Sequence, residues 1–524
     1  MLTTLAAPAF AKTWYIENGD ITISAGKDGN DVTQNNVTTK NDTNTIITNQ
    51  KTDTASSNTV TIEANGKNDK VEVTLKDVNI DTSSRNNAAV SVTGSGNTTI
   101  KLDGDNHLTG GISDNGSYGL SGISSSGSLT ISGGETDSLT AQGGSGTDGS
   151  GGRGIFSKDL TISGGTVNAN GGDGKNGSGG SGITSLGSLT ISGGTVNAAG
   201  GDGTNSSDGG DGITNNRGVT ISSGGTVTAK GGSGEDGSGG RGISSFGGVT
   251  ISSGGTVTAT GGNSTGSDGS GGDGISSTST TISGGTVTAD GGSGNFSGGN
   301  GIRSFDVAIS GGTVNVAGGN GGNGSGSDVG NGIYSSDIDL SGSLELTAKA
   351  GSPNGKALSQ RGNELDLDDI KDKLGPGAKV TAINANGDSK QVSIPRPVEP
   401  EEPVIPGDSS SSSGGGSADA SVQESVFPGL VVTDKDGQRI SYTSTQSGNT
   451  LTVCVGRFTA SFRISLAALR QLRAEGIDTI TFQTILCSTT LSLDELLAMG
   501  GEDAEVVLTH HIRSSTLTVG GKAV

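Results

Sequence analysis

The sequence predicts an all-β protein built mainly as a right-handed parallel β-helix, a solenoid of stacked coils. A phrase of about 30 residues recurs through residues 119–351, and each copy holds two runs in which apolar and polar residues alternate. Alternation with a period of two indicates strands, and a fixed period of this length indicates a stacked array, because one copy is too poor in apolar residues to build a core. No proline occurs between Pro8 and Pro353, as expected of a ladder in which every strand donates its backbone N–H groups.

The copy that begins at Gly154 shows the expected strands. In residues 160–163 and again in 166–169 the aliphatic side chains share one face, and the glycines at 164 and 165 permit a bend between the two runs. A third short strand is expected at Ile155. Equivalent residues of successive copies should then stack in three apolar columns. They are Ile131, Ile162, Ile191, Ile221, Ile251, Ile282 and Ile309; Val167, Val196, Val227, Val257, Val287 and Val314; and Ile155, Ile183, Ile213, Ile243, Ile275, Ile302 and Ile333.

The N-terminal part is expected to continue the same architecture. Residues 1–11 are interpreted as the remnant of a secretory signal, because residues 9–11 fit the small-x-small cleavage rule. Residues 12–352 are assigned to the β-helix. Within them, residues 14–16 are expected to cap the open end, and the Asn-rich residues 30–58 are expected to form a solvated excursion.

Beyond the repeats the composition changes. Residues 353–394 are predicted to be a capping segment, with a short helix over 365–374 and a hairpin around Asn386-Gly387. Residues 395–423 are rich in Pro, Ser and Gly and are predicted to be a linker. Residues 424–524 are predicted to form a small α+β domain that could meet a surface partner.

The only two cysteines, Cys454 and Cys487, both belong to this last domain. An exported protein permits a disulfide between them, and two separately buried thiols are the alternative. Ser492 begins a capping box that opens a short helix.

The net charge of −21 limits the choice of partners. Nucleic acids and anionic membranes are poor partners for such a chain, whereas cations, cationic surfaces and neutral sugars are better ones. No segment is long and apolar enough to be predicted as a membrane span. The sequence therefore favours a secreted or cell-surface protein.

The glycine-rich loops between copies suggest calcium. Hard oxygen ligands on a flexible backbone suit Ca²⁺, and residues 119–352 hold 18 acidic and 8 basic residues. The alternative is that these loops are simply solvated. The candidate ligands are Asp148, Asp173, Asp202, Asp211, Asp236 and Asp273.

Outward-facing threonines are expected to form a flat ladder that could bind sugar hydroxyls or ordered water; plain β-propensity on a solvent face is the alternative. Its members are Thr226, Thr228, Thr256, Thr258, Thr286 and Thr288.

A charged row is expected beside this ladder. We assign Arg153, Arg241 and Arg303 to the same position in three copies, and Asp211 and Asp273 to that position in two other copies. Arginine could pair with uronate carboxylates in a bidentate manner, or the row could be a surface charge ladder of little energetic weight. Phe156 is expected to point outward, where it could stack on a sugar.

The sequence predicts no enzyme activity. His107 stands alone, and the pair at 510 and 511 lacks a third ligand at a zinc spacing. The sequence also contains no recognisable Ser/His/Asp or Cys/His arrangement for nucleophilic catalysis.

Two segments resemble a known family: the repeat GIxSxxxLTISGGTVxAxGGxG, as in residues 182–203, and residues 99–106. It is the family of bacterial secreted carbohydrate-binding domains with a parallel β-helix fold and a pectate-lyase-like architecture. The resemblance covers about residues 59–350. It implies a non-enzymatic protein that binds acidic plant polysaccharides such as polygalacturonate, with bound calcium. This chain departs from the family by its long glycine-rich loops. A structural or adhesive surface stalk is the first alternative, and a polysaccharide lyase is a weaker one.

Overall fold

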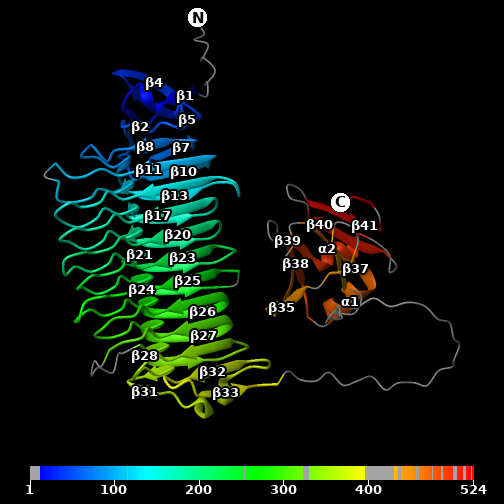
Figure 1. Ribbon diagram of the computed structural model, residues 1–524. Coiled ribbons are helices and arrows are strands. Elements are labelled where there is room, and N and C mark those ends of the chain that lie inside the picture. The colour runs from blue at the N-terminus through cyan, green and yellow to red at the C-terminus, as the bar shows by residue number, and fades with distance from the viewer. Residues whose placement is uncertain are drawn as a thin grey trace, which may run out of the picture. The chain divides into compact units, whose positions relative to one another are not determined.

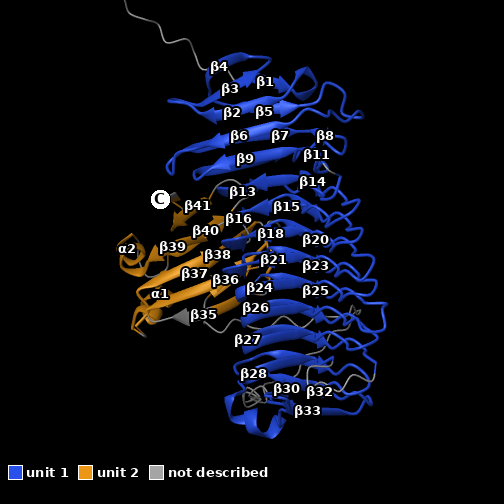
Figure 2. Ribbon diagram, turned by 90° about the vertical axis from the view of Figure 1, so that its left-hand side faces the viewer, with its two compact units in different colours: residues 1–401 blue, residues 402–524 orange. Residues whose placement is uncertain are grey.

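The computed structural model describes residues 12–395, except 115, 253 and 323–329, and parts of 430–523. The gaps in the second range are 435–437, 441, 448, 456, 458, 475, 485–487, 500–503, 511–514 and 521. The chain divides into two compact units, residues 1–401 and 402–524 (Figure 2). The predicted signal remnant 1–11 lies outside the described residues, as does the predicted linker 395–423 apart from Pro395.

The first unit is the predicted parallel β-helix, in which each coil adds a strand to each of three parallel columns (Figure 1). The first column contains β2 (Ile21–Ala25), β6 (Val60–Ala64), β9 (Val90–Gly94), β12 (Ile123–Ser125), β15 (Ile155–Ser157), β18 (Ile183–Ser185), β21 (Ile213–Asn215) and β30 (Leu358–Gln360). The second contains β1 (Lys12–Tyr15), β5 (Thr45–Thr48), β7 (Lys70–Lys76), β10 (Asn97–Asp103), β13 (Ser128–Ser132), β16 (Asp159–Ile162), β19 (Ser188–Ile191) and β22 (Gly218–Ile221). The third contains β8 (Asn79–Asp81), β11 (Asp105–Thr109), β14 (Ser138–Gln142), β17 (Thr166–Asn170), β20 (Thr195–Ala199), β23 (Thr226–Lys230), β25 (Thr256–Thr260), β29 (Glu345–Lys349) and β32 (Lys379–Ile383).

Four longer strands each serve more than one column, because the bends between the runs do not interrupt the ladder there. They are β24 (Ile243–Ile251), β26 (Ile275–Asp290), β27 (Ile302–Ala317) and β28 (Ile333–Leu340).

The predicted apolar columns are confirmed residue by residue. Ile162 pairs with Ile191, Val167 pairs with Val196, and Ile155 pairs with Ile183. The same register continues through the later copies, and these side chains are fully buried in one continuous core. Burial of each aliphatic side chain contributes about 1.5–3 kcal/mol before conformational entropy is subtracted.

The N-terminal end differs from the prediction. The Asn-rich stretch is not a solvated excursion, because β3 (Asn30–Gln34) and β4 (Val37–Asp42) extend β2 as antiparallel strands and bury Val32. β1, with the buried Trp14, pairs with β5 in the second column, and the 3-10 helix η1 (Ile16–Asn18) follows it. The isolated apolar residues of this stretch sit among polar ones, so its periodicity was too weak to indicate strands.

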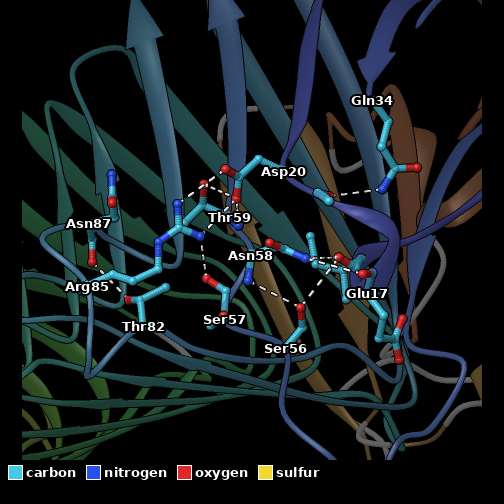
Figure 3. Close-up of polar contacts among 12 residues, drawn as sticks. Glu17, Asp20, Gln34, Ser56, Ser57, Asn58, Thr59, Thr82, Arg85 and Asn87 are labelled. Atoms are coloured by element: carbon cyan, nitrogen blue, oxygen red, sulfur yellow. Dashed lines mark hydrogen bonds and ion pairs between the residues drawn. The ribbon is translucent and has the colours of Figure 1, made fainter. Parts of the chain in front are cut away.

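An ion pair ties these first coils together (Figure 3). The Arg85 guanidinium donates to both carboxylate oxygens of Asp20, at 3.1 and 3.2 Å, and to the Ser57 carbonyl at 2.6 Å. Asp20 also accepts the backbone N–H of Thr59 at 2.7 Å. The arginine thus joins segments far apart in the chain.

The C-terminal end is closed by the predicted capping segment. The expected helix is the 3-10 helix η2 (Leu367–Lys373), and the expected hairpin is β32 with β33 (Ser389–Ser393). A short strand β31 (Asn363–Glu364) pairs with β30. Leu367, Ile370 and Val392 belong to the same core as the coils, so this segment completes the solenoid.

The glycine-rich loops form an ordered feature that we call the glycine rib. It comprises residues 143–154, 171–182, 200–212, 231–242, 261–274 and 291–301, each with an outgoing half that leaves the third column and a returning half that reaches the first. The Gly172 N–H donates to the Gly152 carbonyl of the coil before at 2.8 Å, and the Gly180 N–H donates to the Gly172 carbonyl at 2.8 Å. This alternation between outgoing and returning halves continues through the rib to Gly319.

Successive N–H groups of one segment point to different neighbours. In the outgoing half, Gly171 bonds to Ala199 and Gly174 to Asp202 of the next coil, whereas Gly172 bonds to a returning half. Backbone N–H directions that repeat every three residues are characteristic of extended polyproline II-type helices, which make no hydrogen bonds within themselves. Packed side by side, they satisfy one another's backbone groups.

Only glycine fits this packing. A Cβ on Gly151 would lie 1.8 Å from the Gly172 carbonyl oxygen, and one on Gly240 would lie 1.9 Å from the Gly210 carbonyl oxygen. The loops are therefore regular structures, although side chains such as those of Asp148 and Asp236 are exposed to solvent. Their glycines allow close backbone approach, and the resulting rib is part of the rigid body.

The second unit has its own core, which includes Phe462 and Phe482. A five-stranded sheet contains β34 (Leu430–Thr433), β37 (Ala460–Ser465), β40 (Glu505–His510), β41 (Ser515–Val519) and β42 (Lys522–Ala523). A four-stranded sheet contains β35 (Thr443–Ser447), β36 (Thr450–Cys454), β38 (Thr479–Gln483) and β39 (Ser488–Ser492). Two helices, α1 (Leu466–Ala474) and α2 (Leu493–Ala498), accompany them, and the Ser492 side chain caps α2 as predicted.

The predicted disulfide involves Cys487, which lies outside the described residues. The Cys454 Sγ lies 3.5 Å from Gln483 Oε1, and partial burial raises the pKa of the Cys454 thiol. The pairing stays a prediction. Among the described residues of both units, no helix has the length and apolar character needed to cross a membrane.

We expect Gly240→Ala to lower the free energy of unfolding of the solenoid by about 1–3 kcal/mol or more, because its Cβ would collide with the backbone of the coil before. Gly218→Ala is the matched control, since a Cβ there meets only the Gly248 carbonyl oxygen, at 3.5 Å. Urea unfolding followed by circular dichroism compares the two. Equal stabilities would contradict the close packing of the rib.

Candidate functional site: a groove along the glycine rib

A long concave surface follows the returning halves of the glycine rib. One cavity of about 410 Å³ begins at Tyr118, and a second of about 840 Å³ ends at Phe296 and Arg303. Both are lined by Ser178 and Ser181, so they form one continuous groove. It spans six returning halves, which at about 4.8 Å per coil amounts to roughly 24 Å from the first to the last.

Two rows of polar side chains line this groove. The hydroxyl row contains Ser150, Ser178, Ser238, Ser270 and Ser297, with Asp208 in the remaining coil. The charged row contains Arg153, Ser181, Asp211, Arg241, Asp273 and Asn300. The hydroxyl row was missed from the sequence, although the repeated Ser-Gly-Gly triplet was a signal for it.

In the middle of the charged row both carboxylates accept hydrogen bonds from the protein itself. Asp211 accepts the Arg241 backbone N–H at 2.7 Å and the Thr214 hydroxyl at 3.0 Å. Asp273, only 6% exposed, accepts the backbone and side-chain N–H groups of Asn300 at 2.8 and 2.9 Å. The Arg241 Nε lies 3.9 Å from Asp273 Oδ2. Both carboxylates thus satisfy donors of the next coil.

Arg153 stands at the end of the groove without such a partner. Among the described residues it forms no ion pair, and its guanidinium lies 5.1 Å from the centre of the Phe156 ring. Although the residue is solvent-accessible, desolvation by neighbouring atoms lowers the pKa of Arg153. The group stays charged near neutrality, because arginine is protonated far above that pH.

The assignment of Arg303 to the charged row is wrong. Arg303 pairs with Ser276 and Tyr334 in the first column, which places it in register with Phe156, and Asn300 takes the position in the row. Copies differ in length by a few residues, so spacing in the sequence does not fix the register of Arg303. Phe156 is half-exposed, as predicted.

The aspartates proposed as calcium ligands fall in separate places. Asp173 and Asp202 lie in outgoing halves, where each accepts the backbone N–H one coil on, at 2.9 and 2.7 Å. Asp211 and Asp273 lie in returning halves. Asp148 and Asp236 are exposed near the turns between the halves.

The structure therefore does not bring the six aspartates together. The described residues contain no cluster of three or more His, Cys, Asp or Glu side chains suited to a metal ion. Four of the six carry out a structural task, capping N–H groups that the rib leaves open. Calcium binding stays a prediction.

The threonine ladder lies on the third column, apart from the groove lining. Thr226, Thr256 and Thr286 are in direct register, and so are Thr228, Thr258 and Thr288. All six are exposed or half-exposed. The ladder itself is thus confirmed, and a ligand for it stays a prediction.

Comparison with family models, with curated proteins and with solved structures finds no match for this chain. The function is accordingly argued from the groove itself.

We expect Asp211→Asn to remove one part of the pH dependence of stability. Burial raises the pKa of Asp211 above its ordinary value of 3.8, so the folded chain holds this proton to higher pH than the unfolded chain does. The contribution of Asp211 to the free energy of unfolding should therefore fall as the pH rises from 3.8 through the raised pKa, and the variant should lack this contribution. An asparagine can occupy this row, as Asn300 does.

Urea unfolding of both proteins between pH 4 and 7 measures the difference, with the exposed Asp268→Asn as control. A constant difference between Asp211→Asn and wild type over that range would contradict the burial of an ionisable Asp211.

Proposed function

We propose that the solenoid is a secreted, non-enzymatic carbohydrate-binding protein that holds an acidic polysaccharide, such as polygalacturonate, in the groove along the glycine rib. The observation that carries the proposal is the continuous groove from Tyr118 to Phe296, with its hydroxyl row and charged row. An open polar trough of this length suits an extended polymer better than a compact small molecule.

The chemistry of the lining supports a glycan. Serine hydroxyls recur once per coil and can donate to or accept from sugar hydroxyls at regular intervals. Tyr118 and Phe296, each more than half exposed, offer aromatic surfaces at the two ends. Because the rib is bound to the solenoid by backbone hydrogen bonds, little conformational entropy would be lost on binding.

The preference for an acidic glycan depends on Arg153. The chain repels anions at long range because of its charge of −21, so a local unpaired cation is needed to hold a carboxylate. Calcium enters the proposal as an accessory ion, bridging glycan carboxylates to the exposed Asp148 and Asp236. No reaction is assigned, because the carboxylates of Asp211 and Asp273 in the groove already accept protein N–H donors.

A structural or adhesive stalk is the second candidate. It is favoured by the second compact unit, whose core is separate from that of the solenoid. In that case the solenoid would serve as a spacer, and residues 430–523 would meet the surface partner.

We expect Ser238→Trp to weaken binding of polygalacturonate by about tenfold or more, because an indole would fill the groove at its middle. Thr228→Trp adds the same bulk on the threonine ladder and should leave binding unchanged. Affinity electrophoresis with and without chelator measures both. Loss of binding in Thr228→Trp alone would instead place the glycan on the ladder.

We expect a protein ending at residue 395 to bind polygalacturonate as the full chain does, because the groove lies wholly in the first unit. Retained attachment to a cell surface by residues 430–524 alone, with no glycan binding by the solenoid, would favour the stalk.

A further inference from the structure

A second hollow adjoins the Arg153 end of the groove. It measures about 650 Å³ and lies across the turns between the first and second columns. Five residues around it form what we call the basic patch: Arg153, Phe156, Lys158, Leu186 and Arg217. Arg153 lines the groove and Phe156 lines the hollow, and the contact between them, 5.1 Å from guanidinium to ring centre, joins the two surfaces.

The cations of the patch are unneutralised. Lys158 and Arg217 are exposed, and neither forms an ion pair within the described part of the chain. Asp159 is the one carboxylate of the lining, and it accepts the Ser188 backbone N–H at 3.0 Å and the Ser128 hydroxyl at 3.4 Å.

This concentration of positive charge is local. Residues 119–352 hold 8 basic residues against 18 acidic ones, and three of the 8 meet at the patch. Some cations elsewhere in the solenoid pair along the stack, as Lys101 does with Glu72 and Lys373 with Asp339, whereas Lys230 and Lys349 stand singly among the described residues of the third column. Three unpaired cations on so acidic a chain repel one another, and an anionic ligand would relieve that repulsion.

The patch also offers apolar surface between its charges. The backbone N–H of Leu186 donates to Ser157 at 3.0 Å, which sets Leu186 directly beside Lys158 in the coil that follows. Arg217 lies one coil beyond Leu186. Lys158 and Arg217 are therefore about 10 Å apart along the stack, which is two coil spacings of about 4.8 Å. Leu186 is 44% exposed and Phe156 is half-exposed.

We propose that the basic patch is the subsite that selects the acidic residues of the polysaccharide. One hexuronate residue would place its carboxylate between Lys158 and Arg217, with a bidentate pair to the guanidinium, and lay its C–H face on Phe156 and Leu186. Arg153 would receive the carboxylate of a neighbouring residue where the chain enters the groove. This inference rests on the proposed function and adds the source of its charge selectivity.

The test compares polygalacturonate with its fully methyl-esterified form, which has the same backbone without the charges. We expect the double variant Lys158→Gln/Arg217→Gln to bind polygalacturonate about tenfold more weakly or worse, since each charge-assisted hydrogen bond is strong. Its affinity for the ester should change by less than about twofold, because the hydroxyl row is untouched. Titration calorimetry on the full chain measures both ligands.

The control is Lys230→Gln/Lys349→Gln, which removes the same charge from exposed positions of the third column. It should bind both polymers as the wild type does. An equal loss in the control would assign the effect to net charge and overturn the subsite. Unchanged binding of polygalacturonate by the patch variant would overturn the subsite and leave the proposed function standing, whereas a wild type that binds neither polymer would overturn both.

Discussion

The structure depends on one constraint: every position of a coil must find its equivalent in the next coil at the distance of a backbone hydrogen bond. In the apolar core this constraint stacks Ile162 on Ile191 and Val167 on Val196. An insertion inside a strand would move an entire coil out of register, because neighbouring side chains alternate between core and solvent. Variation in length therefore falls in the turns between strands, those of the rib and also those between the columns, as the register shift between Ser245 and Gly248 shows.

The glycine rib extends the same constraint to segments without side chains. A composition so rich in glycine ordinarily indicates flexible or disordered chain. Here the lost chain entropy is offset by hydrogen bonds that only a bare backbone can form, as at Gly172 between Gly152 and Gly180. Aspartate and asparagine supply the acceptors that the backbone pattern lacks, which explains why Asp173 and Asp202 recur at one position of the outgoing halves, and Asp211 and Asp273 at one position of the returning halves, without forming a metal site.

Much of the fold could be predicted from the sequence, because a repeat period indicates stacked coils whatever the local conformation of each copy. The columns, the third strand at Ile155, the capping hairpin and the α2 cap all follow from it or from local turn chemistry. The groove was not legible, since it exists between successive loops and no single copy contains it. Tyr118 and Phe296 lie in loops that differ from copy to copy, and Lys158 and Arg217 occupy turns outside the alternating runs. Arg303 belongs to the first column although it shares its charge with Arg153 and Arg241, because register and not charge sets the position in a coil.

Charge decides how the proposed binding would work. At physiological ionic strength the repulsion between this acidic chain and an acidic polymer is screened beyond about 8 Å, so only nearby charges matter at contact. Along the middle of the groove the single cation Arg241 faces Asp208, Asp211 and Asp273. Each of these carboxylates accepts a backbone N–H of the next coil, and that negative region offers a glycan its serine hydroxyls. Near Arg153 the balance is positive. A polymer lying in the groove would thus be held by hydrogen bonds along its length and by ionic contacts at one end, which fixes its register along the stack.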